Sequence, residues 1–360
     1  MRRIVVLAVL FGTLAVVSPA AGAGFAFERA LGFTNPLAFD CTTVSGCPIG
    51  ALGGLAGQLY GPSDSVVVGG EVYVADDQNN RISVFSAANG AFVRAFGKDV
   101  GGSGVNTCTT SCQAGTGASD DGALRRPVGI AADSGELYIA ELDGNRISVF
   151  TTDGAFVRKF GTGGSGAGQL NRPSAVAVSG GEVFVVDRGN NRVMVFNTAG
   201  EFQRGIGFTA PAPLNCTSAC VSGAPLDIAG GLNYPSSTAV SGGEVFVADS
   251  INNRINVYSA TTGAFVRSFG EAGSSAGQLS NPVAVAISGG ELYVADYANQ
   301  RVDVFTLAGD FVRAFAKGVN TDDNSNVCTD HCRGAEWGTA ASTLAYDMPP
   351  SIDANSSPQR

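Results

Sequence analysis

Residues 168–207 read GQLNRPSAVAVSGGEVFVVDRGNNRVMVFNTAGEFQRGIG, and this stretch decides the fold. It contains four short apolar runs separated by turn residues, at 174–179, 183–186, 192–196 and 202–206. Short runs rich in Val, Ile and Phe and bounded by Gly, Asn and Asp are typical of β-strands. The Gly180-Gly181 pair suits a two-residue hairpin connection, because glycine adopts positive φ at little cost. The stretch therefore predicts four antiparallel strands.

The same pattern occurs five times along the chain. Its copies occupy residues 57–98, 122–162, 168–207, 230–270 and 277–317. A repeated unit of four antiparallel strands, about 40 residues long, is the signature of a β-propeller blade. Helical periodicity of useful length appears nowhere after residue 23, so we expect an all-β fold.

Three motifs recur in the copies: Pro-x-x-hydrophobic, Gly-Gly-Glu-x-[Tyr/Phe]-Val-x-Asp, and Asn-x-Arg-hydrophobic-x-Val-[Phe/Tyr]. With these motifs the unit resembles the NHL repeat of six-bladed β-propellers, over residues 57–317. The resemblance implies a ring of blades around a central pore. It also implies a binding role for most members of the family and a lyase activity for a few.

The two ends of the chain suggest how the ring closes. Residues 25–32 (FAFERALG) match the last strand of a unit, and residues 343–354 (TLAYDMPPSIDA) match the first strand. We expect an NHL-type six-bladed β-propeller with five complete four-stranded blades and an incomplete sixth shared by the two termini. Residues 24–56 would supply an outer strand and a cysteine loop, and residues 318–360 a cysteine loop and an inner strand. Either the gene product is truncated in this blade, or the blade is a two-stranded remnant.

The N-terminus and the charge indicate the compartment. Arg2 and Arg3 precede the apolar run 4–17, and Ala21-Gly22-Ala23 follows it, so residues 1–23 are predicted to be a cleaved signal peptide. An uncleaved anchor is the alternative, but a membrane span needs about 20 apolar residues. We expect a secreted, monomeric protein without a membrane span after cleavage. The net charge is −9 and no basic run is present, which disfavours nucleic-acid binding.

Eight cysteines form four close pairs. In an exported protein such pairs indicate disulfides, each stabilising its loop by about 2 kcal/mol. Zinc is the alternative, but the single histidine, His331, lies inside the last pair. The predicted local disulfides, all in segments that connect blades, are Cys41–Cys47, Cys108–Cys112, Cys216–Cys220 and Cys328–Cys332.

An acid and an arginine flank the second turn of every repeat. Because the acid and the arginine lie five residues apart across a hairpin, their side chains can form a bidentate ion pair. Their recurrence favours a structural role over a ring of metal-binding acids. The Asn at positions 80, 145, 191 and 253 is predicted to be a turn residue that hydrogen-bonds its own backbone. The acid–arginine pairs are Asp76/Arg81, Glu141/Arg146, Asp187/Arg192, Asp249/Arg254 and Asp296/Arg301.

Candidates for catalysis are weak. Asp64 is the only ionisable residue in the predicted innermost strands, and one carboxylate does not hold a catalytic metal. His331, beside Asp330, is best interpreted as a solvated loop residue, and the Asp322-Asp323-Asn324 segment as at most a weak calcium ligand. The amidating lyases of the resembling family use histidine ligands, which the repeats lack. No catalytic residue, metal ligand or cofactor is assigned, and the ligand-binding residues stay unidentified.

The sequence thus predicts a secreted, non-catalytic scaffold that binds a protein, peptide or glycan through one decorated face. The alternative is a propeller-type lyase or lactone hydrolase with a metal at the central pore. Because strands alternate in direction, the cysteine inserts and the acid–arginine turns should share one face of the ring, with the Gly-Gly hairpins on the other. The partner is expected to dock beside a ridge of three consecutive inserts.

Overall fold

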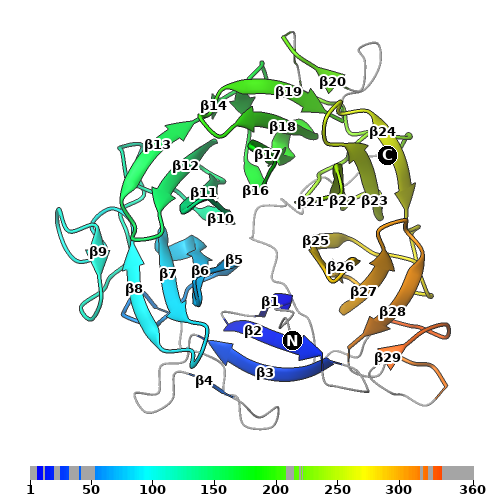
Figure 1. Cartoon of the computed structure of the whole chain (residues 1–360), viewed down its shortest axis with the longest axis horizontal. Helices are drawn as coiled ribbons and strands as arrows, with labels where there is room; N and C mark the ends of the chain where they lie inside the picture. The colour runs from blue at the N-terminus through cyan, green and yellow to red at the C-terminus, as the bar shows by residue number, and fades with distance from the viewer. Residues whose placement is uncertain are drawn as a thin grey trace, which may run out of the picture.

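The computed structural model describes the backbone of four N-terminal strands and residues 53–207, 215–218, 220, 222–316, 319–322 and 327–334. It shows an all-β propeller, with sheets arranged radially in a ring (Figure 1). Within the described part of the chain, no helix is long and apolar enough to cross a membrane.

Each of the five repeats forms one blade, an antiparallel sheet whose strands follow chain order from the centre of the ring outward (Figure 1). The first blade consists of β5 (Pro62–Val68), β6 (Glu71–Asp76), β7 (Arg81–Ser86) and β8 (Phe92–Phe96). The second blade consists of β10 (Pro127–Asp133), β11 (Glu136–Glu141), β12 (Arg146–Thr151) and β13 (Phe156–Phe160). The third is β16 (Pro173–Ser179), β17 (Glu182–Asp187), β18 (Arg192–Asn197), β19 (Phe202–Ile206). The fourth blade consists of β21 (Ser237–Ser241), β22 (Glu244–Asp249), β23 (Arg254–Ser259) and β24 (Phe265–Phe269). The fifth consists of β25 (Pro282–Ser288), β26 (Glu291–Asp296), β27 (Arg301–Thr306) and β28 (Phe311–Phe315).

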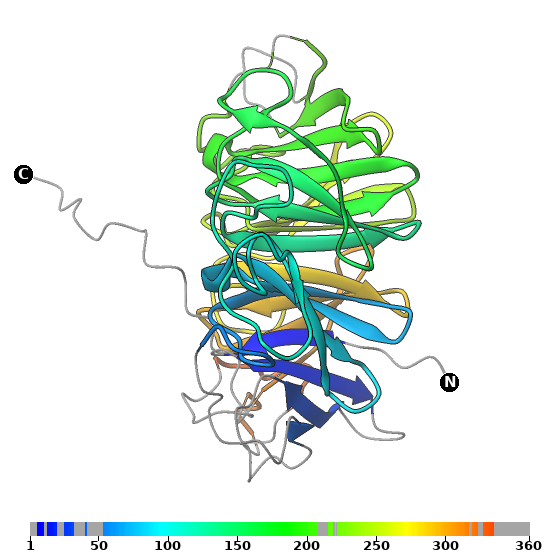
Figure 2. The ribbon, with the colours of Figure 1, turned by 90° about the vertical axis from the view of Figure 1, so that its left-hand side faces the viewer.

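The hydrophobic core lies between neighbouring blades. The second and third strands are buried on both faces, because a blade packs on each side of them. A phenylalanine of the fourth strand contacts an aromatic ring of the next blade, as in Phe160 and Phe196, whose ring centroids are 5.0 Å apart. Gly200 leaves room for this pair, because a Cβ there would lie 2.7 Å from the Phe160 ring. Figure 2 shows the strands crossing the thickness of the ring.

The cysteine inserts extend the blades. Three of them contain a two-residue strand that pairs antiparallel with the outer strand of the preceding blade, so each of these inserts adds a fifth strand to the sheet. These strands are β9 (Thr107–Cys108), β20 (Asn215–Cys216) and β29 (Val327–Cys328), and they lie at the outer rim of the ring (Figure 1). The remaining short elements are β14 (Thr162–Gly163), β15 (Gln169–Leu170) and the 3₁₀ turns η1 (Asp77–Asn79) and η2 (Arg188–Asn190).

The prediction of six blades is not supported: the structure shows five, and the blade shared by the termini is not among them. The N-terminal residues instead form their own sheet, β1 (Val6–Leu10), β2 (Thr13–Pro19), β3 (Phe25–Leu31) and β4 (Asp40–Cys41). The predicted outer strand is present as β3, but β2 pairs with it, and β1 contacts β5. The Val- and Leu-rich run before residue 20 has high β-propensity and pairs with the edge of β3. The matching residues 343–354 lie outside the described residues, and the signal peptide stays a prediction.

Candidate ligand-binding surface

The acid–arginine pair of each blade is a buried structural centre. In blade three, Arg192 Nε donates to Asp187 Oδ2 over 2.6 Å, and both side chains are fully buried. The two Nη atoms donate to backbone carbonyls of the segment that leads into the blade, including Gln169 O at 2.8 Å. The pair is therefore not the predicted bidentate ion pair, because the two Nη atoms donate to backbone carbonyls of the connecting segment and not to the carboxylate. Burial raises the pKa of Asp187.

The same arrangement recurs around the ring with one variation. Arg81, Arg146 and Arg254 each donate Nε to the acid of their blade and Nη to carbonyls of the preceding connection. In blade five, Arg301 Nε lies 2.9 Å from Asp303 and 3.5 Å from Asp296. Two buried carboxyls thus face one guanidinium there. The acid of every pair is buried, and each arginine fixes the segment that leads into its blade; Arg254 is partly exposed and also pairs with the exposed Asp227.

The acid also fixes the residues that precede the first strand. Asp187 Oδ1 accepts the backbone N–H of Asn171 over 2.6 Å, two residues before the proline that begins β16. In the other blades the acceptor is the acid of the corresponding pair, and the donors are the N–H groups of Tyr60, Arg125, Asn233 and Ser280.

The asparagine that follows the second turn links consecutive blades. Asn145 has φ 51°, and its Oδ1 accepts the N–H of Arg172, the residue before the proline of the next blade, over 2.8 Å. Asn80, Asn191 and Asn253 make the same bond to Arg126, Tyr234 and Asn281. The prediction that these side chains hydrogen-bond their own backbone is thus wrong for their oxygen atoms. They are turn residues, but their Oδ1 atoms accept backbone N–H groups of the next blade.

These contacts build one continuous surface, which we call the junction surface. It consists of the two residues before each first-strand proline and the two residues after each second strand. Within a blade the two segments are joined by backbone hydrogen bonds, such as Gly189 N–H to Asn171 O at 2.8 Å. The residues of the junction surface are 60–61, 77–78, 125–126, 142–143, 171–172, 188–189, 233–234, 250–251, 280–281 and 297–298.

The backbone of the junction surface repeats from blade to blade, but its side chains do not. Tyr60 and Ile251 are 46% and 51% exposed, although both are large and apolar or aromatic. Arg126 forms a bidentate ion pair with Asp77 of the preceding blade, with both N–O distances 2.9 Å. The guanidinium carbon of Arg188 lies 3.9 Å from the ring centroid of Tyr234. Such a rigid backbone with varied, partly exposed side chains suits specific recognition.

The cysteine inserts reach the same side of the ring. Arg81 Nη1 donates to Gln113 O at 3.0 Å, directly after Cys112, and Gly115 N–H donates to Asn79 O at 2.7 Å. The inserts therefore pack against the acid–arginine turns, as the strand directions predicted. The disulfides present are Cys108–Cys112, Cys216–Cys220 and Cys328–Cys332.

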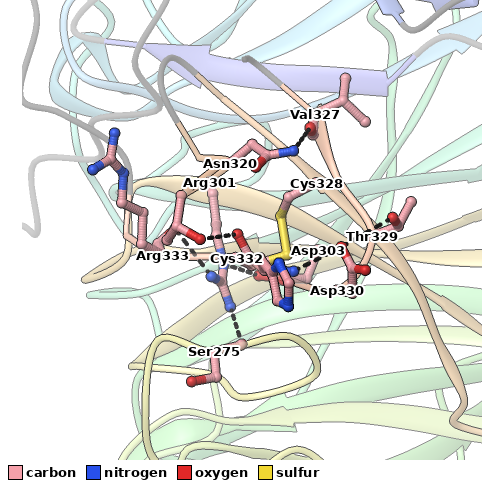
Figure 3. Close-up of a disulfide and its surroundings, with 12 residues drawn as sticks. Ser275, Arg301, Asp303, Asn320, Val327, Cys328, Thr329, Asp330, Cys332 and Arg333 are labelled. Atoms are coloured by element: carbon pink, nitrogen blue, oxygen red, sulfur yellow. Dashed lines mark hydrogen bonds and ion pairs between the residues drawn. A yellow bond between two sulfur atoms is a disulfide. The ribbon is translucent and has the colours of Figure 1, made fainter. Parts of the chain in front are cut away.

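The last of these inserts is drawn in Figure 3, where the disulfide of Cys328 and Cys332 lies beside Arg301 and Arg333. Arg301 Nη1 donates to Arg333 O at 3.1 Å, so the insert again closes over the acid–arginine centre of its blade. Cys47 lies outside the described residues, as does much of the insert at 32–52. The predicted ridge of three inserts is therefore not tested.

A second set of ion pairs, which the sequence analysis missed, lies at the other end of the blades. Glu71 follows the Gly-Gly hairpin and receives a bidentate pair from Arg94 of the fourth strand, with both N–O distances 2.8 Å. Arg94 also donates to Thr152 O of the next blade at 2.7 Å. The signal was present in the sequence, since Gly-Gly-Glu and Phe-x-Arg recur together. The equivalent pairs are Glu136/Arg158, Glu182/Arg204, Glu244/Arg267 and Glu291/Arg313.

The other candidate residues do not converge on a site. Asp64 accepts the N–H of Ser65 and of Ile130 in the next blade, and burial raises its pKa to about 6. His331 Nδ1 lies 2.6 Å from Asp322, which raises the pKa of the imidazole, and both side chains are exposed. The carboxylate beside the imidazole is therefore Asp322, while Asp330 accepts the backbone N–H of His331. Residues 323 and 324 of the acidic loop lie outside the described residues.

Comparison with known proteins agrees with the fold. The family model "NHL repeat" matches residues 170–196, 232–258 and 279–305, so the chain contains NHL repeats. No curated protein matches the sequence significantly.

Similar solved structures share the fold at low sequence identity. The structure of a nidogen/laminin complex is 15% identical with a TM-score of 0.53, covering 89% of this chain and 95% of that chain. A streptogramin B lyase is 13% identical with a TM-score of 0.50, covering 86% and 85%. An inactive histidine-to-alanine variant of virginiamycin B lyase from Staphylococcus aureus, bound to quinupristin, is 13% identical with a TM-score of 0.48, covering 86% of each chain.

Proposed function

We propose that this NHL-repeat β-propeller is an exported, non-catalytic scaffold that binds a protein or peptide through the junction surface. One observation carries the proposal: the backbone geometry of the junction surface repeats from blade to blade, while its side chains differ. The same acid-to-backbone hydrogen bond holds the residue two positions before the first-strand proline, while that exposed residue changes from Tyr60 to Arg125 to Asn171. Preformed loops lose little conformational entropy on binding, which favours affinity.

Export of the protein is supported by the three disulfides, because such bonds persist mainly in oxidising compartments. The predicted signal peptide agrees with this compartment. The clipped inserts stiffen the rim beside the junction surface, since each packs against an acid–arginine turn.

A lyase is the alternative. Such chemistry needs a positioned acid or base, and the single histidine of the chain lies on an exposed insert, paired with Asp322. Among the described residues, no group of three or more His, Cys, Asp and Glu side chains is arranged to hold a metal ion. Incubation of the purified protein with a streptogramin B tests the alternative directly, and we expect the intact compound to disappear no faster than it does without protein.

The binding proposal is tested by selecting peptides from a random displayed library on the immobilised protein. The selected peptides should lose most of their affinity for the variant Tyr60→Ala/Ile251→Ala. The matched control is Val157→Ala/Val266→Ala, which truncates two residues of the outer strands that are 40% and 46% exposed. Equal binding to the wild type and both variants would place the ligand elsewhere, and failure to enrich any peptide would contradict a protein-binding role.

A further inference from the structure

Blade four departs from the repeat at its acid–arginine centre. In blade four the residue 27 positions before Arg254 is Asp227, and Arg254 Nη1 donates to its side-chain Oδ1 over 2.9 Å. In the other four blades the arginine Nη1 donates instead to the backbone carbonyl of the residue 27 positions earlier. A carboxylate thus replaces a backbone carbonyl that suffices for the fold elsewhere. The residues that supply the carbonyl are Gly54, Ser119, Ser165 and Ser274.

This replacement leaves a negative charge at the surface. The side chain of Asp227 is 78% exposed and that of Arg254 13%, whereas the corresponding arginines of the other blades are at most 8% exposed. Arg254 also donates Nε to the buried Asp249, which is ionised at pH 7 because burial raises its pKa only to about 6. One positive charge therefore faces two negative ones, a local balance of −1. Sequences depart from their own structural rules mainly at functional sites, and the other blades show that the fold needs no acid at this position.

Two exposed isoleucines lie on the segments that meet at this centre. Ile228 directly follows the exposed carboxylate residue and is 45% exposed, and Ile251 is 51% exposed. Their segments lie side by side, because the side chain of Asn252 donates Nδ2 to Leu226 O over 3.0 Å. Arg254 fixes the same loop, since its Nη2 donates to Ile228 O over 2.8 Å. Exposed apolar side chains bordered by a charge are typical of an interaction surface.

We call Asp227, Ile228 and Ile251 the blade-four patch. Ile251 belongs to the junction surface, so the patch extends that surface onto the loop that follows Cys220.

We propose that the ligand is a peptide segment that presents a cationic side chain next to an apolar one to the blade-four patch. The cationic group would pair with the exposed carboxylate of Asp227, and an arginine matches it in both geometry and charge. The apolar side chain would pack on Ile228 and Ile251. The net charge of −9 also attracts a cationic partner to the molecule and opposes an acidic one. The inference rests on the proposed function and specifies the chemistry of the ligand.

The probe is a short peptide, blocked at both ends, that carries an arginine between two leucines; its control replaces the arginine by glutamine. Binding to the whole purified protein is measured by fluorescence anisotropy at low and high salt. We expect the arginine peptide to bind at least about fivefold more tightly at low salt, with the difference reduced at high salt. The variant Asp227→Asn keeps a side-chain oxygen for Arg254 and should abolish the preference. The charge-matched control Asp153→Asn, in the exposed turn between β12 and β13, should retain it.

The apolar half of the patch is tested separately. The variant Ile228→Ala/Ile251→Ala should weaken the binding of both peptides by at least about fivefold and leave the ratio of their affinities unchanged, because it removes apolar contact area but no charge. The matched control is Val157→Ala/Val266→Ala, on the outer strands, which should bind both peptides as the wild type does. Undiminished affinity in the isoleucine variant would overturn the assignment of the ligand to the blade-four patch.

The outcomes separate this inference from the proposed function. Equal affinity for both peptides, no detectable binding of either, or an arginine preference that survives in Asp227→Asn overturns the inference, and so does a preference lost equally in Asp153→Asn. Displayed peptides that require Tyr60 and Ile251 would still support binding at the junction surface.

Circular dichroism melts identify any variant that fails to fold. If Asp227→Asn does not fold, Asp227→Ser replaces it, because serine occupies this position in blades two, three and five, where a backbone carbonyl accepts the arginine Nη1. An undiminished preference in Asp227→Ser contradicts the inference.

Discussion

Asn145 in blade two accepts the backbone N–H of Arg172 at the start of blade three over 2.8 Å, and this bond joins the two blades at the junction surface. Asn145 also adopts a left-handed backbone conformation with φ 51°. One residue therefore ends a turn and sets the position of the next blade. Because four asparagines act in this way, the spacing of the junction surface is defined by side chains as well as by strands.

Substitution of Asn145 separates these two roles. Glycine keeps the left-handed conformation without strain but removes the hydrogen bond, so we expect Asn145→Gly to lower the free energy of unfolding by about 1 kcal/mol. Alanine removes the bond and adds backbone strain, so Asn145→Ala should cost about 2 kcal/mol. Urea denaturation measures both. If Asn145→Gly is as stable as the wild type, the bond between blades contributes nothing.

Removal of Asp187 should be far more damaging. The side chain is buried and accepts hydrogen bonds from Arg192 and from the backbone of Asn171. Asp187→Ala leaves a buried guanidinium without its carboxylate, which costs about 3–5 kcal/mol in comparable sites. The control is Asp153→Ala, which alters an exposed turn. A loss below 1 kcal/mol for Asp187→Ala would contradict the structural role of the pair.

The buried carboxyls of blade five should make the stability of the protein depend on pH. Burial and the nearby Asp296 raise the pKa of Asp303, so the folded state holds a proton that the unfolded chain releases near the ordinary aspartate pKa, at about pH 4. Because the folded state binds more protons, stability is lost as the pH rises above that value. Asp303→Asn removes this loss and should be at least as stable as the wild type at pH 7. Urea melts across this pH range measure the difference.

Blade four supplies the reciprocal control for that experiment. Asn256 occupies the position of Asp303 there and donates to Asp249 at 3.0 Å. Asn256→Asp would place a second carboxyl beside Asp249, so its stability should fall with rising pH more steeply than that of the wild type. Parallel pH profiles for the wild type and both variants would show that the buried carboxyl pair has no effect.

Loss of a disulfide should loosen an insert without unfolding the ring. The Cys328–Cys332 bridge closes a short loop, and a loop of this size contributes about 2 kcal/mol in the chain-entropy model. In Cys328→Ala/Cys332→Ala, amide exchange should accelerate at 319–322 and 327–334 and stay unchanged in β26 and β27. Accelerated exchange throughout blade five would show that the bridge holds the fold itself.

The sequence was informative wherever the pattern was local. In the third repeat the predicted runs at 174–179 and 202–206 correspond to β16 and β19, because turn glycines and Val-rich runs define strands within a few residues. The positions of the inserts relative to the acid–arginine turns also followed from strand direction.

Contacts between blades could not be predicted in the same way. The oxygen acceptor of Asn145 meets a donor 27 residues later, and Arg94 meets a carbonyl 58 residues later, in the next blade. Such partners depend on how whole sheets pack. The N-terminal segment is ambiguous for another reason, since an apolar Val- and Leu-rich run satisfies both the pattern of a signal peptide and that of a strand, and the signal peptide stays a prediction.

Hydrogen–deuterium exchange of the protein, with and without a peptide enriched from the displayed library, tests ligand binding at the junction surface most directly. If the ligand binds there, exchange should slow in the segments around 125–126, 171–172, 188–189 and 233–234, where the backbone amides lie beside the bound peptide. Slowed exchange confined to the Gly-Gly hairpins at 69–70, 180–181, 242–243 and 289–290, at the other end of the blades, would contradict it.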